Sequence, residues 1–121
     1  MSSWRIVLVL AVFALEPIPI AYGQVQVLPF TGEMRYMADA ARFTDCRTGR
    51  SYPIAMEADY VKMERAYREA VGEPGGPLCV TFEGFIVPRP KMEGDGLETT
   101  VVVERFINVW PEEKCGRGPE K

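Results

Sequence analysis

The chain has 121 residues, a formal net charge of −3 and no histidine. The acidic balance makes the chain a poor electrostatic match for nucleic acid or anionic lipid, and the sequence contains no basic stripe. The absence of histidine removes the commonest general base and the commonest ligand for transition metals. The sequence therefore favours a small domain whose function does not depend on imidazole chemistry.

The first 23 residues have the composition of a secretory signal peptide. Arg5 supplies a positive charge, residues 6–15 form an apolar run, and Ala21 to Gly23 offer a small-residue cleavage site. The apolar run is too short to span a bilayer, which takes about 20 residues. We expect cleavage before Gln24, which leaves 98 of the 121 residues as one soluble periplasmic or secreted domain. Because no cysteine lies near the cleavage site, we expect no membrane anchor after cleavage.

Residues 24–53 predict an extended arm followed by three short strands. The proline in residues 24–31 favours an N-terminal arm over a central strand. Residues 33–38 predict the first strand, and a turn at Asp39 and Ala40 leads into a hairpin over residues 42–53. The tight polar turn of that hairpin is Arg47-Thr48-Gly49.

In residues 59–71 the apolar side chains recur with a period of about 3.6, which predicts one amphipathic helix. Asp59 is the expected N-cap, and Gly72 is the expected stop at the C-terminal end. Glu64 and Arg68 form an i,i+4 ion pair in the favourable order. The stripe of tyrosine and methionine on the opposite face predicts core packing.

Two longer strands are predicted after the helix, over residues 78–87 and 99–110, with a functional or solvated loop at 88–98. Gly84 in the middle of the first strand predicts a sharp bend. In the second strand Arg105 interrupts the apolar alternation. Either a bulge shifts the register near Glu104, or Arg105 pairs with Glu83 on the preceding strand.

The element order is therefore β-β-β-α-β-β in a mainly β chain with one helix. This order predicts an OB-like barrel of five strands over residues 32–115, followed by a flexible tail at 116–121. Nothing in the order specifies a catalytic activity.

The three cysteines predict one disulfide and one leftover thiol in an oxidising compartment. Cys46 and Cys115 lie at the ends of predicted elements, where a bridge does not distort a strand ladder, so we expect these two to pair. Cys79 lies inside a predicted strand, on the face opposite the core, and is expected to remain a free thiol. We expect a monomer.

Catalytic and metal-binding chemistry is sparse. Ser51 is the one serine after residue 23, and it lacks the sequence context of a triad nucleophile. Four acidic residues could converge in the fold as the site of a carboxylate hydrolase: Asp39, Asp45, Glu83 and Glu104. The favoured interpretation is that their charges are solvated or paired across strands.

A site for Cu(I) is the other open alternative, because thioether and thiol ligands suit that ion. The candidate ligands are Met34, Met37 and Cys79. Met34 and Met37 are three residues apart on a predicted strand and therefore point to opposite faces. Packing of these methionines in the core or on the surface is favoured, and no cofactor is expected.

The chain also resembles a known family. Four segments together resemble the C-terminal OB-fold domain of NlpE-type envelope proteins. They are GEMRYMADAARFTDCRTGRSYPIAMEADYVKMERAY, the end of the following strand at EG, the loop PRPKMEG, and VVVERF. The resemblance covers residues 32–115. It implies an OB fold, a domain disulfide through Cys46 and Cys115, and an association with envelope stress and copper homeostasis in Gram-negative bacteria.

The part of NlpE-type proteins usually tied to copper is an N-terminal barrel with a CxxC motif and a lipid anchor, and this chain has neither the motif nor an anchoring cysteine. We therefore expect a non-enzymatic periplasmic module that senses envelope stress or binds an envelope protein or small ligand. A copper-handling protein is the alternative.

Overall fold

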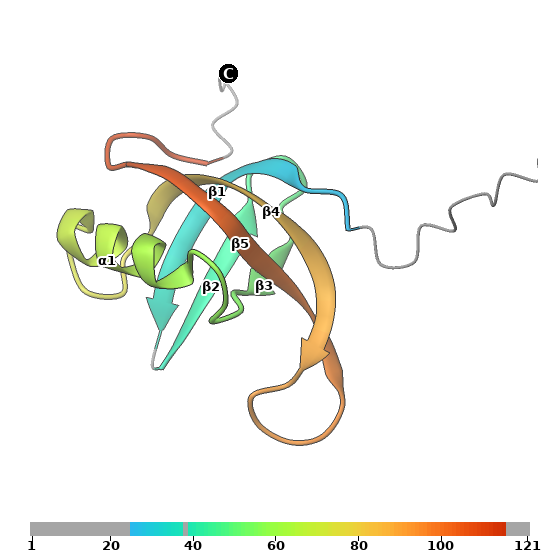
Figure 1. Ribbon diagram of the computed structural model, residues 1–121. Helices are drawn as coiled ribbons and strands as arrows, with labels where there is room; N and C mark the ends of the chain where they lie inside the picture. The colour runs from blue at the N-terminus through green and yellow to red at the C-terminus, as the bar shows by residue number, and fades with distance from the viewer. Residues whose placement is uncertain (1–24, 38, 116–121) are drawn as a thin grey trace, which may run out of the picture.

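A computed structural model describes residues 25–37 and 39–115. The predicted signal peptide and the predicted tail lie outside the described residues. Five strands and one helix follow one another along the chain (Figure 1). They are β1 (Leu28–Met37), β2 (Ala40–Asp45), β3 (Ser51–Pro53), α1 (Tyr60–Ala70), β4 (Leu78–Pro90) and β5 (Leu97–Trp110).

The strands form one antiparallel sheet in the order β3-β2-β1-β4-β5. β1 is the central strand, and it begins at Leu28, so the predicted arm over residues 24–31 is wrong in its second half. Residues 28–31 pair with β4 alone, since the pairing of β1 with β2 starts at Gly32. Pro29 is tolerated because this part of β1 still has one open side, where no ladder hydrogen bond needs an N–H.

The core lies between the curved sheet and α1. Three aromatic rings form its centre: Phe43 and Phe82 have ring centroids 4.9 Å apart, and Phe30 stacks on Phe82 at 5.4 Å. From the helix, Met63 and Tyr67 are fully or almost fully buried against this cluster. The stripe that the period of 3.6 predicted is thus the packing face of α1.

The two ends of α1 differ from the prediction. The Asp59 side chain makes no cap hydrogen bond; its Oδ2 instead accepts from the backbone N–H of Phe106 on β5, at 2.9 Å. At the other end, Val71 turns extended with φ −70° and ψ 138°, so the helix ends before Gly72. The Asp59 carboxylate therefore binds the backbone of β5 instead of capping the helix, as the local sequence had predicted.

β4 and β5 form a long hairpin that bends at Gly84. The register shifts between Thr81 and Phe82 and again between Glu83 and Gly84. Arg105 Nε also lies 3.0 Å from Glu83 Oε1. Both explanations of the break in the apolar pattern at Arg105 are therefore correct. β5 bulges, and Arg105 pairs with Glu83 across the strands.

The outer part of this hairpin extends as a two-stranded arm, which hangs below the sheet in Figure 1. β4 runs on to Pro90 and β5 starts at Leu97, so the predicted loop over residues 88–98 is reduced to residues 91–96. We define residues 85–90 and 97–100 as the hairpin arm. The two prolines of PRP suggested a loop, but they occupy positions where the ladder needs no N–H, as shown below.

The predicted barrel is not closed. β3 and β5 are the two edges of the sheet, and one parallel bridge between Ile54 and Val101 is what joins them. β3 has three residues, too few for a continuous ladder to β5. The result is an open, strongly curved OB-like sheet. No helix in the described part of the chain is long and apolar enough to cross a membrane.

Candidate functional site

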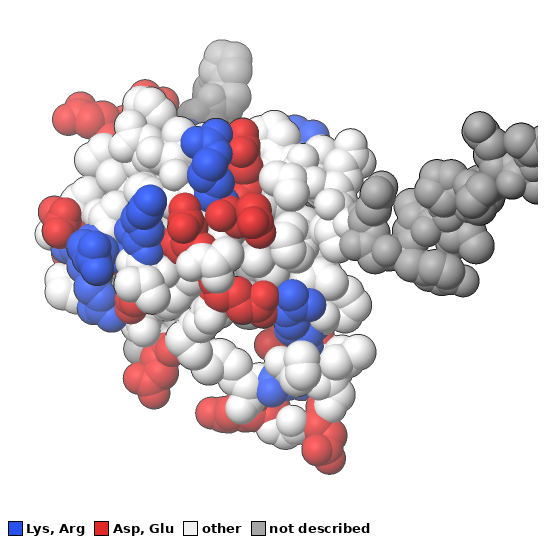
Figure 2. Space-filling view, viewed as in Figure 1, with Lys and Arg blue, Asp and Glu red and all other residues white. Residues whose placement is uncertain are grey.

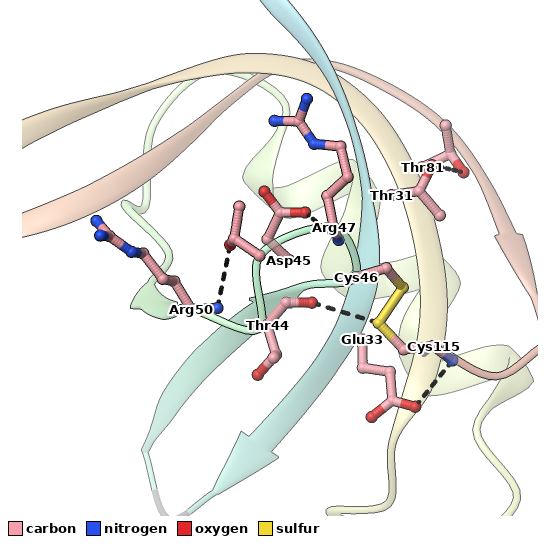
Figure 3. Close-up of a disulfide and its surroundings, with 10 residues drawn as sticks. Thr31, Glu33, Thr44, Asp45, Cys46, Arg47, Arg50, Thr81 and Cys115 are labelled. Atoms are coloured by element: carbon pink, nitrogen blue, oxygen red, sulfur yellow. Dashed lines mark hydrogen bonds between the residues drawn. A yellow bond between two sulfur atoms is a disulfide. The ribbon is translucent and has the colours of Figure 1, made fainter. Parts of the chain in front are cut away.

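The candidate site lies at the end of the sheet that carries the disulfide (Figure 3). Cys46, in the turn after β2, is bonded to Cys115; the two Cα atoms lie 5.0 Å apart and the sequence separation is 69. Residues 111–115 follow β5 and are called the strap. The disulfide fastens the end of the strap to the β2–β3 turn.

Local hydrogen bonds hold that turn in shape. Asp45 is buried, and its Oδ1 accepts from the backbone N–H of Arg47 at 2.8 Å. Its carbonyl accepts from Gly49 N at 2.8 Å, and Gly49 adopts φ +77°, which favours glycine. Cys46 N donates to Thr31 O on β1 at 3.0 Å. Cys46 is thus fixed against the central strand before the disulfide is considered.

The strap lies across the outer face of β1 and β4. Its last residue, Cys115, donates its backbone N–H to Glu33 Oε2 at 3.3 Å (Figure 3). Where the strap begins, Trp110 Nε1 donates to Thr81 Oγ1 at 2.9 Å. Thr81 Oγ1 lies 3.3 Å from Thr31 Oγ1. Polar side chains of β1 and β4 therefore dock both ends of the strap, and the disulfide completes the attachment.

Cys79 lies on the same outer face and is 4% exposed. It is outside the aromatic core, as its strand parity predicted. With Glu33, Glu113 and Lys114 it lines a hollow of about 260 Å³. Burial, followed by the nearby carboxylates of Glu113 and Glu33, raises the pKa of the Cys79 thiol. A raised pKa lowers the thiolate fraction of Cys79 and therefore its nucleophilicity.

The Cu(I) candidates are not brought together. Met34 is fully buried in the core, Met37 is 57% exposed at the far end of β1, and Cys79 lies on the opposite face of the sheet from Met34. Within residues 25–37 and 39–115 there is also no cluster of three or more Cys, Asp or Glu residues that could hold a metal ion.

The four candidate acids have separate structural surroundings. Asp45 caps its own turn, and Glu83 pairs with Arg105, whose hydrogen bond lowers the pKa of the Glu83 carboxyl. Asp39 is exposed in the turn before β2, and Glu104 is exposed on β5.

Two hollows were not foreseen from the sequence. The larger, about 580 Å³, lies beside the C-terminal end of α1 and is lined by Tyr36, Tyr67 and Arg68 together with the loop at 71–75. The Arg68 guanidinium lies 4.8 Å from the centre of the Tyr36 ring. Tyr67 donates its hydroxyl to Gly76 O, which ties the loop to the helix.

The second hollow lies between the hairpin arm and the opposite edge of the sheet. It has two adjoining parts of about 360 and 190 Å³, and Pro53, Met92 and Glu98 line both. Its walls come from residues 39–42, residues 53–57 and residues 89–100. These segments are far apart in sequence, so no local pattern could reveal the hollow. The exposed methionine in the PRPKMEG segment was the one available signal.

Charges of both signs alternate on the face shown in Figure 2, where Lys and Arg side chains lie next to Asp and Glu. The described residues form three ion pairs. One is bidentate: Arg89 Nε and Nη2 donate to the two carboxylate oxygens of Glu57 at 2.7 and 3.0 Å. The visible surface has no continuous basic or acidic face.

Comparisons with known proteins agree on one relationship. Residues 24–116 match the family model described as the NlpE C-terminal OB domain. The chain is 39% identical over 97 residues to lipoprotein NlpE of Escherichia coli strain K12. That alignment covers 78% of this chain but 40% of the relative, so the chain spans less than half the length of that protein.

A solved structure is also similar, that of the Cpx pathway activator NlpE from Escherichia coli. The TM-score is 0.68 over 83% of this chain and 51% of that chain, at 24% sequence identity. At this level of identity the structural match supports the fold alone. The fold of this chain is thus similar to that of part of a solved structure.

Proposed function

Because this chain belongs to the NlpE C-terminal OB domain family, we propose that it is a non-enzymatic binding module of the Gram-negative envelope that takes part in stress sensing. The observation that carries the proposal is the family match over residues 24–116, which includes the whole described domain. The similar protein of known structure is named as an activator of the Cpx pathway. Only its C-terminal part corresponds to this chain, so signalling by the module alone is part of the proposal.

The surroundings of the polar side chains support a role in binding over catalysis. The buried carboxylate of Asp45 and the hydroxyl of Tyr67 are both used to hold backbone in place. Every buried side-chain nitrogen or oxygen among the described residues has a hydrogen-bond partner. A catalytic centre usually contains polar groups that await a substrate. The pKa of the Tyr60 hydroxyl is strongly raised, first by burial and then by the Glu64 carboxylate, and this side chain belongs to the packed core.

The disulfide supports location in the periplasm. Structural disulfides persist in oxidising compartments, whereas thiols of the bacterial cytoplasm are kept reduced. The proposed signal peptide at residues 1–23 would deliver the domain to such a compartment. Export and disulfide formation would therefore occur together.

A stress reporter in a Gram-negative host tests the proposal. The exported chain is expected to raise the activity of a reporter of the envelope-stress response. The matched control is the same chain without residues 2–23, which stays in the cytoplasm and is expected to leave the reporter unchanged. Equal reporter activity with both forms, at equal protein levels, would contradict the proposed role in sensing.

A further inference from the structure

One edge of the hairpin arm carries backbone groups that face outward and are free to pair. Val101 O accepts from Ala55 N, and Val103 O accepts from Asp59 N, both at 2.9 Å. These two residues of β5 therefore direct their N–H and C=O groups away from β4. The register from Leu97 to Val103 is continuous, so Leu97 and Thr99 direct theirs to the same side. Within the described residues, no strand pairs with β5 on that side beyond the single bridge at Val101.

The other edge of the arm is closed to pairing. Pro88 faces Thr99 and Pro90 faces Leu97 in the ladder. Because Thr99 and Leu97 point their backbone groups away from β4, these are not hydrogen-bonded pairs, and the missing proline N–H costs the ladder nothing. Pro88 and Pro90 instead remove backbone N–H donors from the outer edge of β4. Prolines on an exposed strand edge prevent edge-to-edge association. The arm is thus protected on the β4 side and open on the β5 side.

The open edge borders the second hollow described above. Its smaller part is lined by Pro53, Ala55 and Met56 together with Met92, Glu98 and Thr100. Met56 and Met92 are 65% and 64% exposed, a high value for apolar side chains. Flexible thioethers adapt to aliphatic side chains of varied shape. A strand laid along the β5 edge would place alternate side chains against the lining of this hollow.

We propose that the β5 edge at Leu97 and Thr99 binds an extended peptide segment of another protein, with aliphatic residues at alternate positions, as an added strand. A row of N–H and C=O groups is complementary to peptide backbone and not to lipid or nucleic acid. The net charge of −3 also disfavours anionic polymers. The inference rests on the proposed function, because it names the surface through which the module binds.

Selection from a phage-displayed library of random peptides tests the surface. The target is the full chain recovered from the periplasm, and the selected peptides are measured against two variants. Thr99→Pro removes the outward N–H without removing a bond to β4, and is expected to weaken binding roughly tenfold, the effect of losing a backbone hydrogen bond and close strand approach. The matched control, Thr99→Val, keeps the N–H and is expected to bind as the unchanged chain does.

Amide hydrogen exchange provides a second measurement on the unchanged chain, which keeps the test valid if Thr99→Pro fails to fold. Bound peptide is expected to slow exchange at Leu97 and Thr99. Enriched peptides that leave both amides unprotected would contradict binding at the β5 edge, but not the proposed binding function. Failure to enrich any peptide would overturn the inference, and so would protection of both amides by self-association at high protein concentration.

Discussion

Gly84 lies where β4 bends and where the register between β4 and β5 shifts. A Cβ added to this residue would collide with the carbonyl oxygen of Val102 and crowd the Phe82 ring. Gly84 therefore matters for the close approach of two backbones, which a glycine within a predicted strand suggested. The sequence did not identify the atom that approaches.

Replacing Gly84 with alanine is expected to lower the free energy of unfolding by about 2 kcal/mol or more, because backbone atoms must move to admit the methyl group. Gly72→Ala is the matched control, since an added Cβ there meets nothing within 4 Å. Urea unfolding of both variants makes the comparison. Equal midpoints would show that the β4–β5 contact at Gly84 relaxes without cost.

At the scale of elements, the periodicity of the sequence predicted the helix and the order of strands, because each of these reflects a local pattern. It failed at the start of β1 and at both ends of the loop over residues 88–98. Proline was the misleading signal at the start of β1 and at the start of the loop, and the acidic glycine turn was the misleading signal at its end. Pro29, Pro88 and Pro90 occupy strand positions at which the missing N–H faces an open edge, and that depends on register, which local sequence does not contain.

The strap is the element whose role is most directly testable. It shares a hollow with Cys79, and burial together with two carboxylates raises the pKa of that thiol. A thiol reacts as its thiolate, so alkylation of Cys79 in the folded protein is expected to be slow at neutral pH and to accelerate only in more alkaline solution.

Releasing the strap is expected to change this rate. In the Cys46→Ser, Cys115→Ser double variant the strap has lost its covalent attachment, and alkylation of Cys79 is expected to be markedly faster than in the unchanged chain. Alkylation in denaturant, where both proteins expose Cys79, is the control for intrinsic reactivity. The same rate in both folded proteins would show that the strap does not protect the thiol.

At the scale of the whole molecule, the sequence predicted the fold class and the cysteine pair, but not the open barrel. Cys46 and Cys115 were identified because element ends are visible in sequence. The shortness of β3 and the single bridge from Ile54 to Val101 depend on tertiary packing. The open β5 edge and its hollow were missed for the same reason, since distant segments form them.

The disulfide is expected to supply a large part of the stability of this open sheet. It closes 69 residues, for which the chain-entropy model assigns about 4 kcal/mol, a large share of the total for a small domain. The Cys46→Ser, Cys115→Ser variant should therefore melt at a much lower temperature. Cys79→Ala is the control that alters a cysteine and keeps the bridge. A double variant that melts with the unchanged protein would contradict a structural role.

The most direct test of a disulfide-tied module in the envelope is the intact mass of the protein recovered from its own bacterium, after alkylation of free thiols in denaturant without reductant. We predict a chain that begins at Gln24 and carries one alkyl group, on Cys79. This result would establish export and the closed bridge together. A chain with three alkyl groups, or one that retains residues 1–23, would contradict the account.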